Sequence, residues 1–106
     1  MAWISLMIAG VLEILWAYSM KLSDGFTKLG ASAVTIVAMI ASFALLSYSM
    51  KTLPLGTAYT IWTGIGAVGA FVVGIIVLGE QANPMRILAA MLIVSGLLLM
   101  KVATPA

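Results

Sequence analysis

A chain of 106 residues that is 64% hydrophobic and only 8% charged cannot fold as a water-soluble domain, because such a domain is about half apolar and about a quarter charged. So short a chain keeps a large exposed surface after folding, and here that surface must be apolar and face lipid. The net charge of +2, without a basic run, excludes a nucleic-acid-binding protein, and the absence of Cys and His gives no basis for a disulfide, a metal centre, a cofactor or an enzyme.

Four apolar runs divide the chain, and each is close to the length of about 20 residues that a transmembrane helix needs. The predicted helices cover residues 2–20, 29–50, 55–79 and 85–100, with the polar breaks KLSDGFTK, KTLP and EQANPMR between them. Asn83 before Pro84 is typical of the cap and first turn of a helix. Since backbone in lipid must satisfy its own hydrogen bonds, helices are required. The sequence therefore predicts an all-α membrane protein, with a single four-helix transmembrane domain over residues 1–106.

Glu13 is a carboxylate in the middle of the first apolar run, AGVLEILWA. This run lacks the basic start of a signal peptide, so we expect it to be retained as a helix. An ionisable residue at this depth is costly and usually functional, and its short side chain reaches the interface with difficulty. Residues three and four positions apart share a helix face, and the stripe that holds Glu13 also contains Ala9, Gly10, Trp16 and Ala17. The small members make room either for a ligand or for another helix.

The second apolar run offers polar and flexible side chains at similar helical spacing, namely Thr35, Met39 and Ser42. The Ser42 hydroxyl is able to hydrogen-bond a carboxylate, although Ser in a membrane helix often bonds its own backbone.

The third apolar run has a stripe of aromatic and small residues, formed by Tyr59, Trp62, Thr63 and Gly66. The aromatic rings either form an interfacial belt or offer π-faces to a cation and donors to a carboxylate. The nearby glycines, Gly64, Gly66 and Gly69, allow either close helix packing or a kink.

One buried acid with aromatic walls, hydroxyl donors and no other charge at its depth forms a site for a cation. A proton and a cation compete for that carboxylate, and this mutual exclusion is the minimal device for proton/cation antiport. One copy provides few helices for a sealed pathway, whereas a homodimer provides twice as many and two acids. A passive channel, a structural membrane subunit and an ion-translocating ring are the alternatives of other classes.

The basic residues are almost evenly split between the two membrane faces. Short loops make neighbouring helices antiparallel, which puts Lys21, Lys28 and Arg86 on one face and Lys51 and Lys101 on the other. Because the Lys and Arg bias sets orientation, so small a difference barely decides it. Either a terminal charge or a partner fixes one orientation, or the chain inserts both ways and the two orientations pair as an antiparallel dimer.

Four segments together resemble the small multidrug resistance transporters: AGVLEILWA, KLSDGFTKLGAS, KTLPLGTAYTIWTGIGAVGA and GEQANPMR. The resemblance covers nearly the whole chain. It implies four helices per subunit in an antiparallel, dual-topology homodimer in the lipid bilayer, and proton-coupled export of cations with Glu13 of both subunits in one shared site.

Within that family, Trp16 three residues after the acid, and GTAY followed by IWTGIGA, look like the guanidinium-exporter subtype. This resemblance implies a multi-pass protein of the bacterial cytoplasmic (inner) membrane that exchanges protons for guanidinium and small substituted guanidinium cations. A broader multidrug exporter of quaternary ammonium cations is the alternative.

The resemblance also implies roles for individual residues. The substrate and proton site would consist of Glu13, Trp16, Ser42, Tyr59 and Trp62, with the last four in a hydrogen-bonding network around the acid. Residues that would line the site are Gly10, Ala17, Met39, Thr60 and Thr63. A kink of the third helix would fall at Gly64 and Gly66, and the dimer interface would include Ala89, Ser95 and Gly96.

Thr60 departs from the family pattern, in which Ala is usual at this position. Its hydroxyl is expected either to compete for Tyr59 or Ser42, which would admit bulkier cations, or to bond the Gly56 carbonyl without effect on the site.

Overall fold

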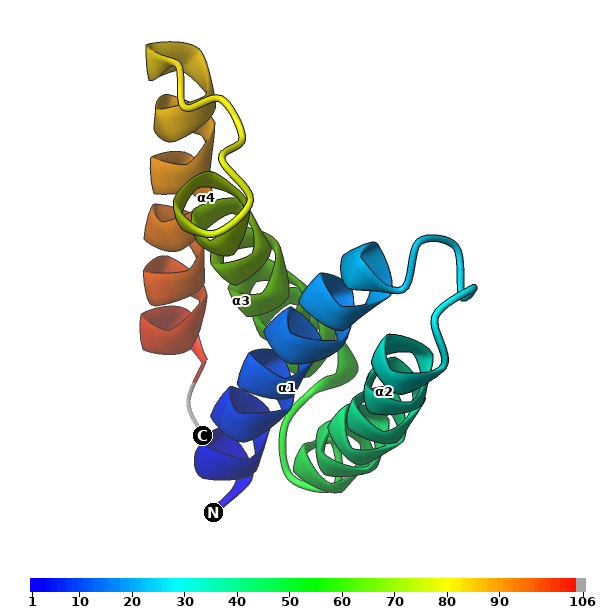
Figure 1. Cartoon of the computed structure of the whole chain (residues 1–106). Coiled ribbons are helices and arrows are strands. Elements are labelled where there is room, and N and C mark those ends of the chain that lie inside the picture. Colours follow the sequence, from blue (N-terminus) through cyan, green and yellow to red (C-terminus); the bar gives the residue numbers. More distant parts are fainter. Residues whose placement is uncertain (105–106) are drawn as a thin grey trace.

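The computed structural model describes residues 1–104 as four helices joined by short loops (Figure 1). The helices are α1 (Ala2–Leu22), α2 (Leu29–Ser49), α3 (Leu55–Ile76) and α4 (Pro84–Ala103). All four are long and apolar enough to cross a membrane, and residues 1–104 contain no strand. The predicted all-α membrane fold is thereby confirmed.

Local hydrogen bonds set the helix ends, and some ends differ from the expected ones by two or three residues. Helix α1 continues to Leu22, where the Ser23 hydroxyl donates to the Met20 carbonyl at 2.7 Å and accepts from the Phe26 amide at 3.0 Å. These bonds satisfy backbone groups that the end of a helix leaves unpaired.

Helix α3 ends at Ile76, three residues before the expected Gly79. Gly79 adopts a φ of +71°, which favours glycine, and the following Glu80 amide donates to the Gly74 carbonyl at 2.9 Å. Helix α4 begins at Pro84 after the Asn83 cap, whose side chain accepts from the Arg86 amide at 2.8 Å. It continues to Ala103, three residues beyond the expected end.

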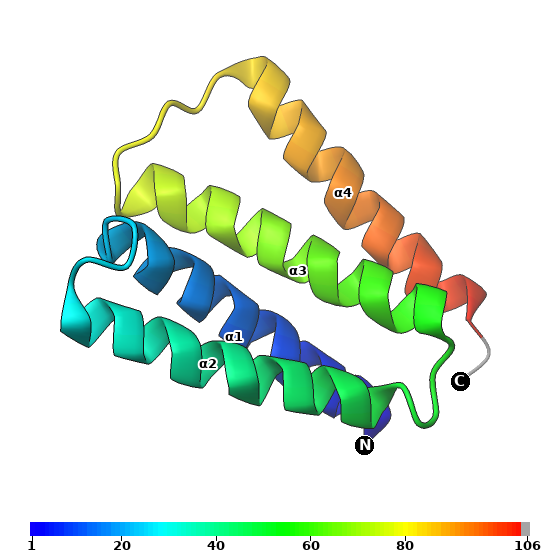
Figure 2. The same ribbon diagram turned by 90° about the vertical axis from the view of Figure 1, so that its right-hand side faces the viewer.

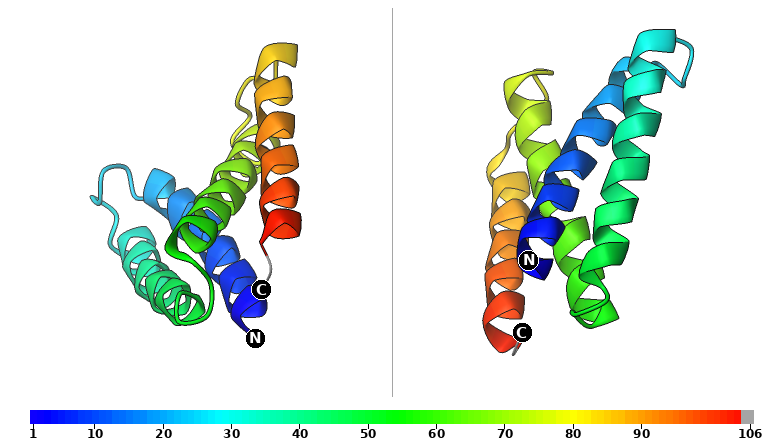
Figure 3. Two further views of the ribbon diagram at one scale, coloured as in Figure 1. Left: turned by 180° about the vertical axis from the view of Figure 1, so that it is seen from behind. Right: turned by 90° about the horizontal axis from the view of Figure 1, so that it is seen from below.

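Helix α1 is the centre of the packing, because it lies against both α2 and α3, while α4 packs mainly against α3 (Figure 2). The four helices form a flat body of 42 × 34 × 16 Å (Figure 3). Within residues 1–104, α4 contributes no buried residue. Most of α4 is therefore available to lipid or to another chain.

The core lies between α1, α2 and the first half of α3. It is made of small and medium apolar side chains with one indole, and the buried members are Leu6, Ala9, Leu46, Leu53, Ala58, Ile61 and Trp62. Trp62 thus belongs to the core and to the predicted site at once, so the site is built on the best-packed part of the molecule.

Candidate cation site

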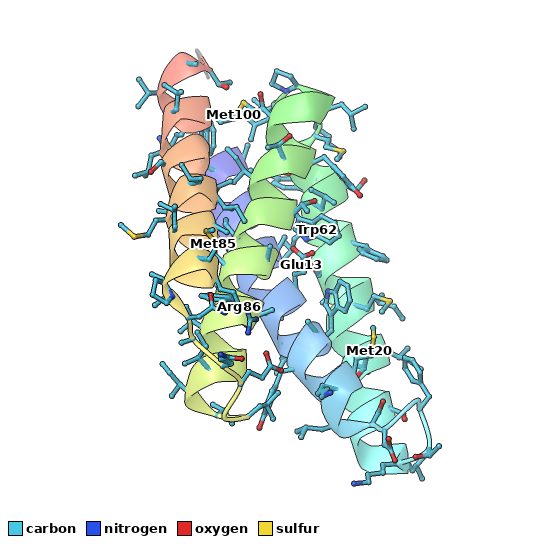
Figure 4. All side chains as sticks on the ribbon, turned by 90° about the horizontal axis from the view of Figure 1, so that it is seen from above. Glu13, Met20, Trp62, Met85, Arg86 and Met100 are labelled. Atoms are coloured by element: carbon cyan, nitrogen blue, oxygen red, sulfur yellow. The ribbon has the colours of Figure 1, made fainter. Side chains whose placement is uncertain are left out.

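Glu13 lies in the middle of α1 and is half-buried (Figure 4). Its carboxyl faces Gly66 of α3, where a methyl group added to the glycine would collide with the carboxyl carbon and oxygen. Among the described residues, the buried Oε1 of Glu13 has no hydrogen-bond partner. Buried polar groups are nearly always paired, so this oxygen is an acceptor still available to a ligand or a proton.

Ser42 joins α2 to both neighbouring helices. Its hydroxyl donates to the Ala9 carbonyl of α1 at 2.7 Å and accepts from Nε1 of Trp62 of α3 at 2.9 Å. The single hydroxyl proton is used on Ala9, so Ser42 does not donate to the Glu13 carboxylate. The expected bond between Ser42 and the acid is wrong for this structure, and the serine instead orients the indole of Trp62.

Four aromatic rings from three helices form a continuous row. Phe43 of α2 stands edge-on between Trp16 of α1 and Trp62 of α3, with ring centroids 6.3 and 5.7 Å away. Tyr59 extends the row, with its ring centroid 5.6 Å from that of Trp62. Edge-to-face rings at these separations attract each other, so the row is a stable wall.

Trp16 and Tyr59 belong to this row by ring contact rather than by hydrogen bonds. Nε1 of Trp16 is buried and has no partner among the described residues, and the Tyr59 hydroxyl makes no hydrogen bond within residues 1–104. The expected network around Glu13 is therefore present only as the Trp62–Ser42 bond. Trp16 Nε1 is a buried donor and Glu13 Oε1 a buried acceptor, and both remain available.

Phe43 was not predicted from the sequence. It is 47% exposed, and its position in the run SFALLSY is typical of a lipid-facing residue. The available signal was its spacing, because Phe43 follows Met39 by four residues and therefore shares its helix face.

The residues predicted to line the site separate into four environments. Gly10 is buried under α3, where a Cβ would come within 2.6 Å of Cγ2 of Ile65, so it is a packing contact. Met39 is half-buried on α2. Ala17 borders a cavity of about 340 Å³ that also reaches Glu80 and Arg86 near the loop between α3 and α4.

Thr60 and Thr63 are exposed on α3 and line, together with Tyr59, a groove of about 510 Å³ against α4. Thr60 makes no hydrogen bond among the described residues. None of its three expected partners is found, since it bonds neither the Gly56 carbonyl nor the hydroxyl of Ser42 or Tyr59. The correction follows from geometry, because Thr60 faces α4 while Ser42 lies under Trp62 on the other side of α3.

The glycines of α3 are points of close approach between helices. A Cβ at Gly64 would collide with Leu97 of α4, just as one at Gly66 would collide with Glu13. Helix α3 is continuous over Leu55–Ile76. Close packing therefore accounts for both glycines in this structure, and the expected kink stays a prediction.

The predicted dimer residues on α4, Ala89, Ser95 and Gly96, are all exposed. Ser95 donates its hydroxyl to the Met91 carbonyl of its own helix at 2.9 Å, and nothing lies within 4 Å of a Cβ built on Gly96. No other helix within residues 1–104 covers these three small residues.

Comparison with known proteins decides the family, because residues 1–93 match the family model described as Small Multidrug Resistance protein. The chain belongs to the small multidrug resistance family. Its relatives include proteins named guanidinium exporter from Citrobacter freundii and Salmonella typhimurium, each 56% identical over 104 residues, and from Escherichia coli (strain K12), 55% identical over 104 residues. Each alignment covers 98% of this chain and 99% of the relative.

This small multidrug resistance protein is a multi-pass protein of the bacterial inner membrane, as its four apolar helices and its transporter family show. The resemblance inferred from its four sequence segments is confirmed over nearly the whole chain, including the likeness to guanidinium exporters.

Proposed function

We propose that the chain is a proton-coupled antiporter that exports guanidinium and small substituted guanidinium cations from the bacterial cytoplasm. The observation that carries the proposal is the buried, unpaired carboxylate oxygen of Glu13, set among aromatic rings in a chain that is 56% identical to proteins named guanidinium exporter. An apolar site with one acid and a wall of rings suits a single cation.

The chemistry of the site favours guanidinium over a quaternary ammonium ion. Guanidinium is planar and rich in N–H donors, so it pairs with a carboxylate through directed hydrogen bonds and stacks on flat rings. Trp62 is held by Ser42, and Phe43 fixes the angle between the two indoles, which gives a wall of defined orientation. A quaternary ammonium ion has no donors and gains only charge and ring contacts from the same groups.

Coupling follows from competition for Glu13. A proton on the carboxylate removes the charge that binds the cation, and a bound cation occupies the oxygens that would take the proton. Each carboxylate therefore carries one or the other across the membrane. In residues 1–104 no other acid lies at this depth, since Asp24 and Glu80 are in the loops.

The working unit in this proposal is an antiparallel homodimer with Glu13 of both copies in one site. The flat shape of the protomer, the uncovered α4 and the nearly even charge split support it. In this assembly Ala89, Ser95 and Gly96 would contact the second copy, and Gly64 and Gly66 would be the hinge of α3.

The test is transport by purified protein in liposomes that contain a pH-sensitive dye. An outward guanidinium gradient should drive protons inward, and a proton gradient should concentrate guanidinium. A channel would move guanidinium without protons, and a structural subunit would move neither. Tetrapropylammonium is the comparison substrate, and faster exchange of that ion than of guanidinium would favour the broader multidrug exporter.

A further inference from the structure

A groove of about 320 Å³ between α1, α3 and α4 is not used by the proposed transport mechanism. Its walls are apolar side chains, among them Ile4, Met7, Val94 and Leu98, and Lys101 is its only charged lining residue. Ile4 precedes Glu13 by nine residues, which is two and a half helical turns. The Ile4 wall of the groove is therefore on the side of α1 that points away from the Glu13 carboxyl.

Two close contacts form the floor of this groove. Ile65 of α3 lies on Gly10 of α1, and Leu97 of α4 lies on Gly64 of α3, in each case too close for a Cβ on the glycine. Both Ile65 and Leu97 also line the groove. Because the glycines let three helices pack closely at these points, the side chains of Ile65 and Leu97 are held in place and define the shape of the groove floor.

The charged end of the groove lies at the membrane surface. Lys101 is two residues before the end of α4 at Ala103, and its ammonium nitrogen lies 4.7 Å from the ring centroid of Trp3. Trp is enriched at this level of the bilayer. Lys101 is exposed and forms no ion pair within residues 1–104, so its positive charge is available to an anion.

The groove spans about two thirds of one leaflet. From Lys101 to Val94 the helix rises by about 10 Å, at about 1.5 Å per residue. The hydrocarbon core is about 30 Å thick, so one leaflet offers about 15 Å to an acyl chain. The groove therefore offers an anionic head group a positive charge at its outer end and covers about the first 10 Å of the acyl chain below it.

We propose that this groove is a binding site for an anionic phospholipid. The phosphate lies beside the Lys101 ammonium, and one acyl chain lies along Met7, Val94 and Leu98. Basic pockets between transmembrane helices select anionic head groups. A zwitterionic phospholipid would fill the same groove and also carries a phosphate, but it would gain less, since its own ammonium group offsets the phosphate charge and is repelled by Lys101.

The first test measures the binding of single phospholipids by native mass spectrometry of purified protein in detergent. Phosphatidylglycerol and phosphatidylcholine with identical acyl chains are compared. Lys101→Gln should weaken phosphatidylglycerol binding about fivefold and leave phosphatidylcholine unchanged. Lys51→Gln is the matched control, because Lys51 is on the same membrane face and lies 5.6 Å from the Tyr48 ring centroid but does not line the groove.

If Lys101→Gln and Lys51→Gln weakened phosphatidylglycerol binding equally, the lipid would be attracted by the positive charge of the whole protein surface. That result would overturn the proposed site. Equal retention of the two phospholipids by the wild type would also overturn it. Millimolar inorganic phosphate should not displace phosphatidylglycerol, because the acyl chain supplies much of the affinity; displacement would assign the site to a free anion instead.

The second test locates the lipid in the unmodified protein. Phosphatidylglycerol with a photoreactive acyl chain should label peptides that contain residues 3–7 and 94–101. Labelling that spreads evenly over the four helices, or that is the same with photoreactive phosphatidylcholine, would contradict the proposal. If a second copy of the chain covers the groove, these two segments should stay unlabelled, which would also overturn it.

Discussion

Gly66 of α3 faces Glu13 of α1, and the carboxyl occupies the space that a side chain at position 66 would need. The depth of the acid between the two helices is therefore set by the absence of a side chain on the opposite helix. Any atom added at this glycine must displace the group that is proposed to bind both proton and cation.

Gly66→Ala should impair transport while the helices remain formed. Overpacking costs typically about 1–3 kcal/mol in folding free energy. A loss of that size in the interaction of the displaced carboxyl with guanidinium corresponds to binding weakened by about 5-fold to about 140-fold. The measurement is guanidinium-driven proton movement in liposomes, with circular dichroism as the check on folding. Gly56→Ala is the control in the same helix, because nothing lies within 4 Å of its Cβ position. Equal transport by the two variants would contradict the assigned role of the Gly66–Glu13 contact.

Glu13→Gln should abolish proton coupling. The amide keeps the shape of the side chain but cannot exchange a proton, so substrate-driven proton movement should vanish. In the wild type, guanidinium should bind more weakly as the pH falls, because protons then occupy the carboxylate. The pH-sensitive dye in liposomes measures the proton movement, and calorimetry across a pH series measures the binding, in which the two acids of a dimer should titrate as a pair. Glu80→Gln, in the loop after α3, should keep the pH dependence; its loss in that variant would place the titrating group elsewhere.

Ser42→Ala should loosen the wall of the site. It leaves Nε1 of Trp62 without its acceptor, while the Ala9 carbonyl keeps its bond within α1, and an unpaired buried group costs about 1–3 kcal/mol. We expect a lower unfolding temperature in detergent and a shifted indole N–H resonance of Trp62. Ser32→Ala, which removes only an exposed bond to the Lys28 carbonyl of the same chain segment, should change neither. An unshifted Trp62 resonance in Ser42→Ala would contradict the interhelical bond.

Insertion should occur in both orientations. Reporter fusions at the C-terminus should signal from both sides of the membrane, because three basic residues on one face oppose two on the other. Adding one or two Lys to either face should bias insertion, and the two biased forms should transport only when expressed together. Signal from one side alone, with full activity, would contradict dual topology.

The fold was predictable because hydropathy alone separates the spans, and lipid requires each span to be a helix. The helix ends were less predictable, since they depend on local bonds such as those of Ser23 and on the positive φ of Gly79. Spacings of three and four residues within one helix correctly predicted which residues share a face. They could not give the rotation of one helix against the next.

That rotation decides the contacts that the sequence left open. It directs the Ser42 hydroxyl to Ala9 rather than to Glu13, and it turns Thr60 toward α4. It also brings Phe43 between two indoles, although the sequence around Phe43 is typical of a segment that faces lipid. Contacts across helices are properties of the packed bundle, and no spacing within one apolar run specifies them.

The protomer measures only 16 Å along its shortest axis, and in the proposed dimer the cation pathway lies between two such chains, so it exists only while they are in contact. Transport then depends on lateral encounters within the plane of the bilayer. At low surface density the rate should rise with the square of the amount of protein, and it should become proportional to that amount once nearly every chain is paired. A cell that makes few copies would thus hold mostly idle protomers, and expression level would act as a threshold for export.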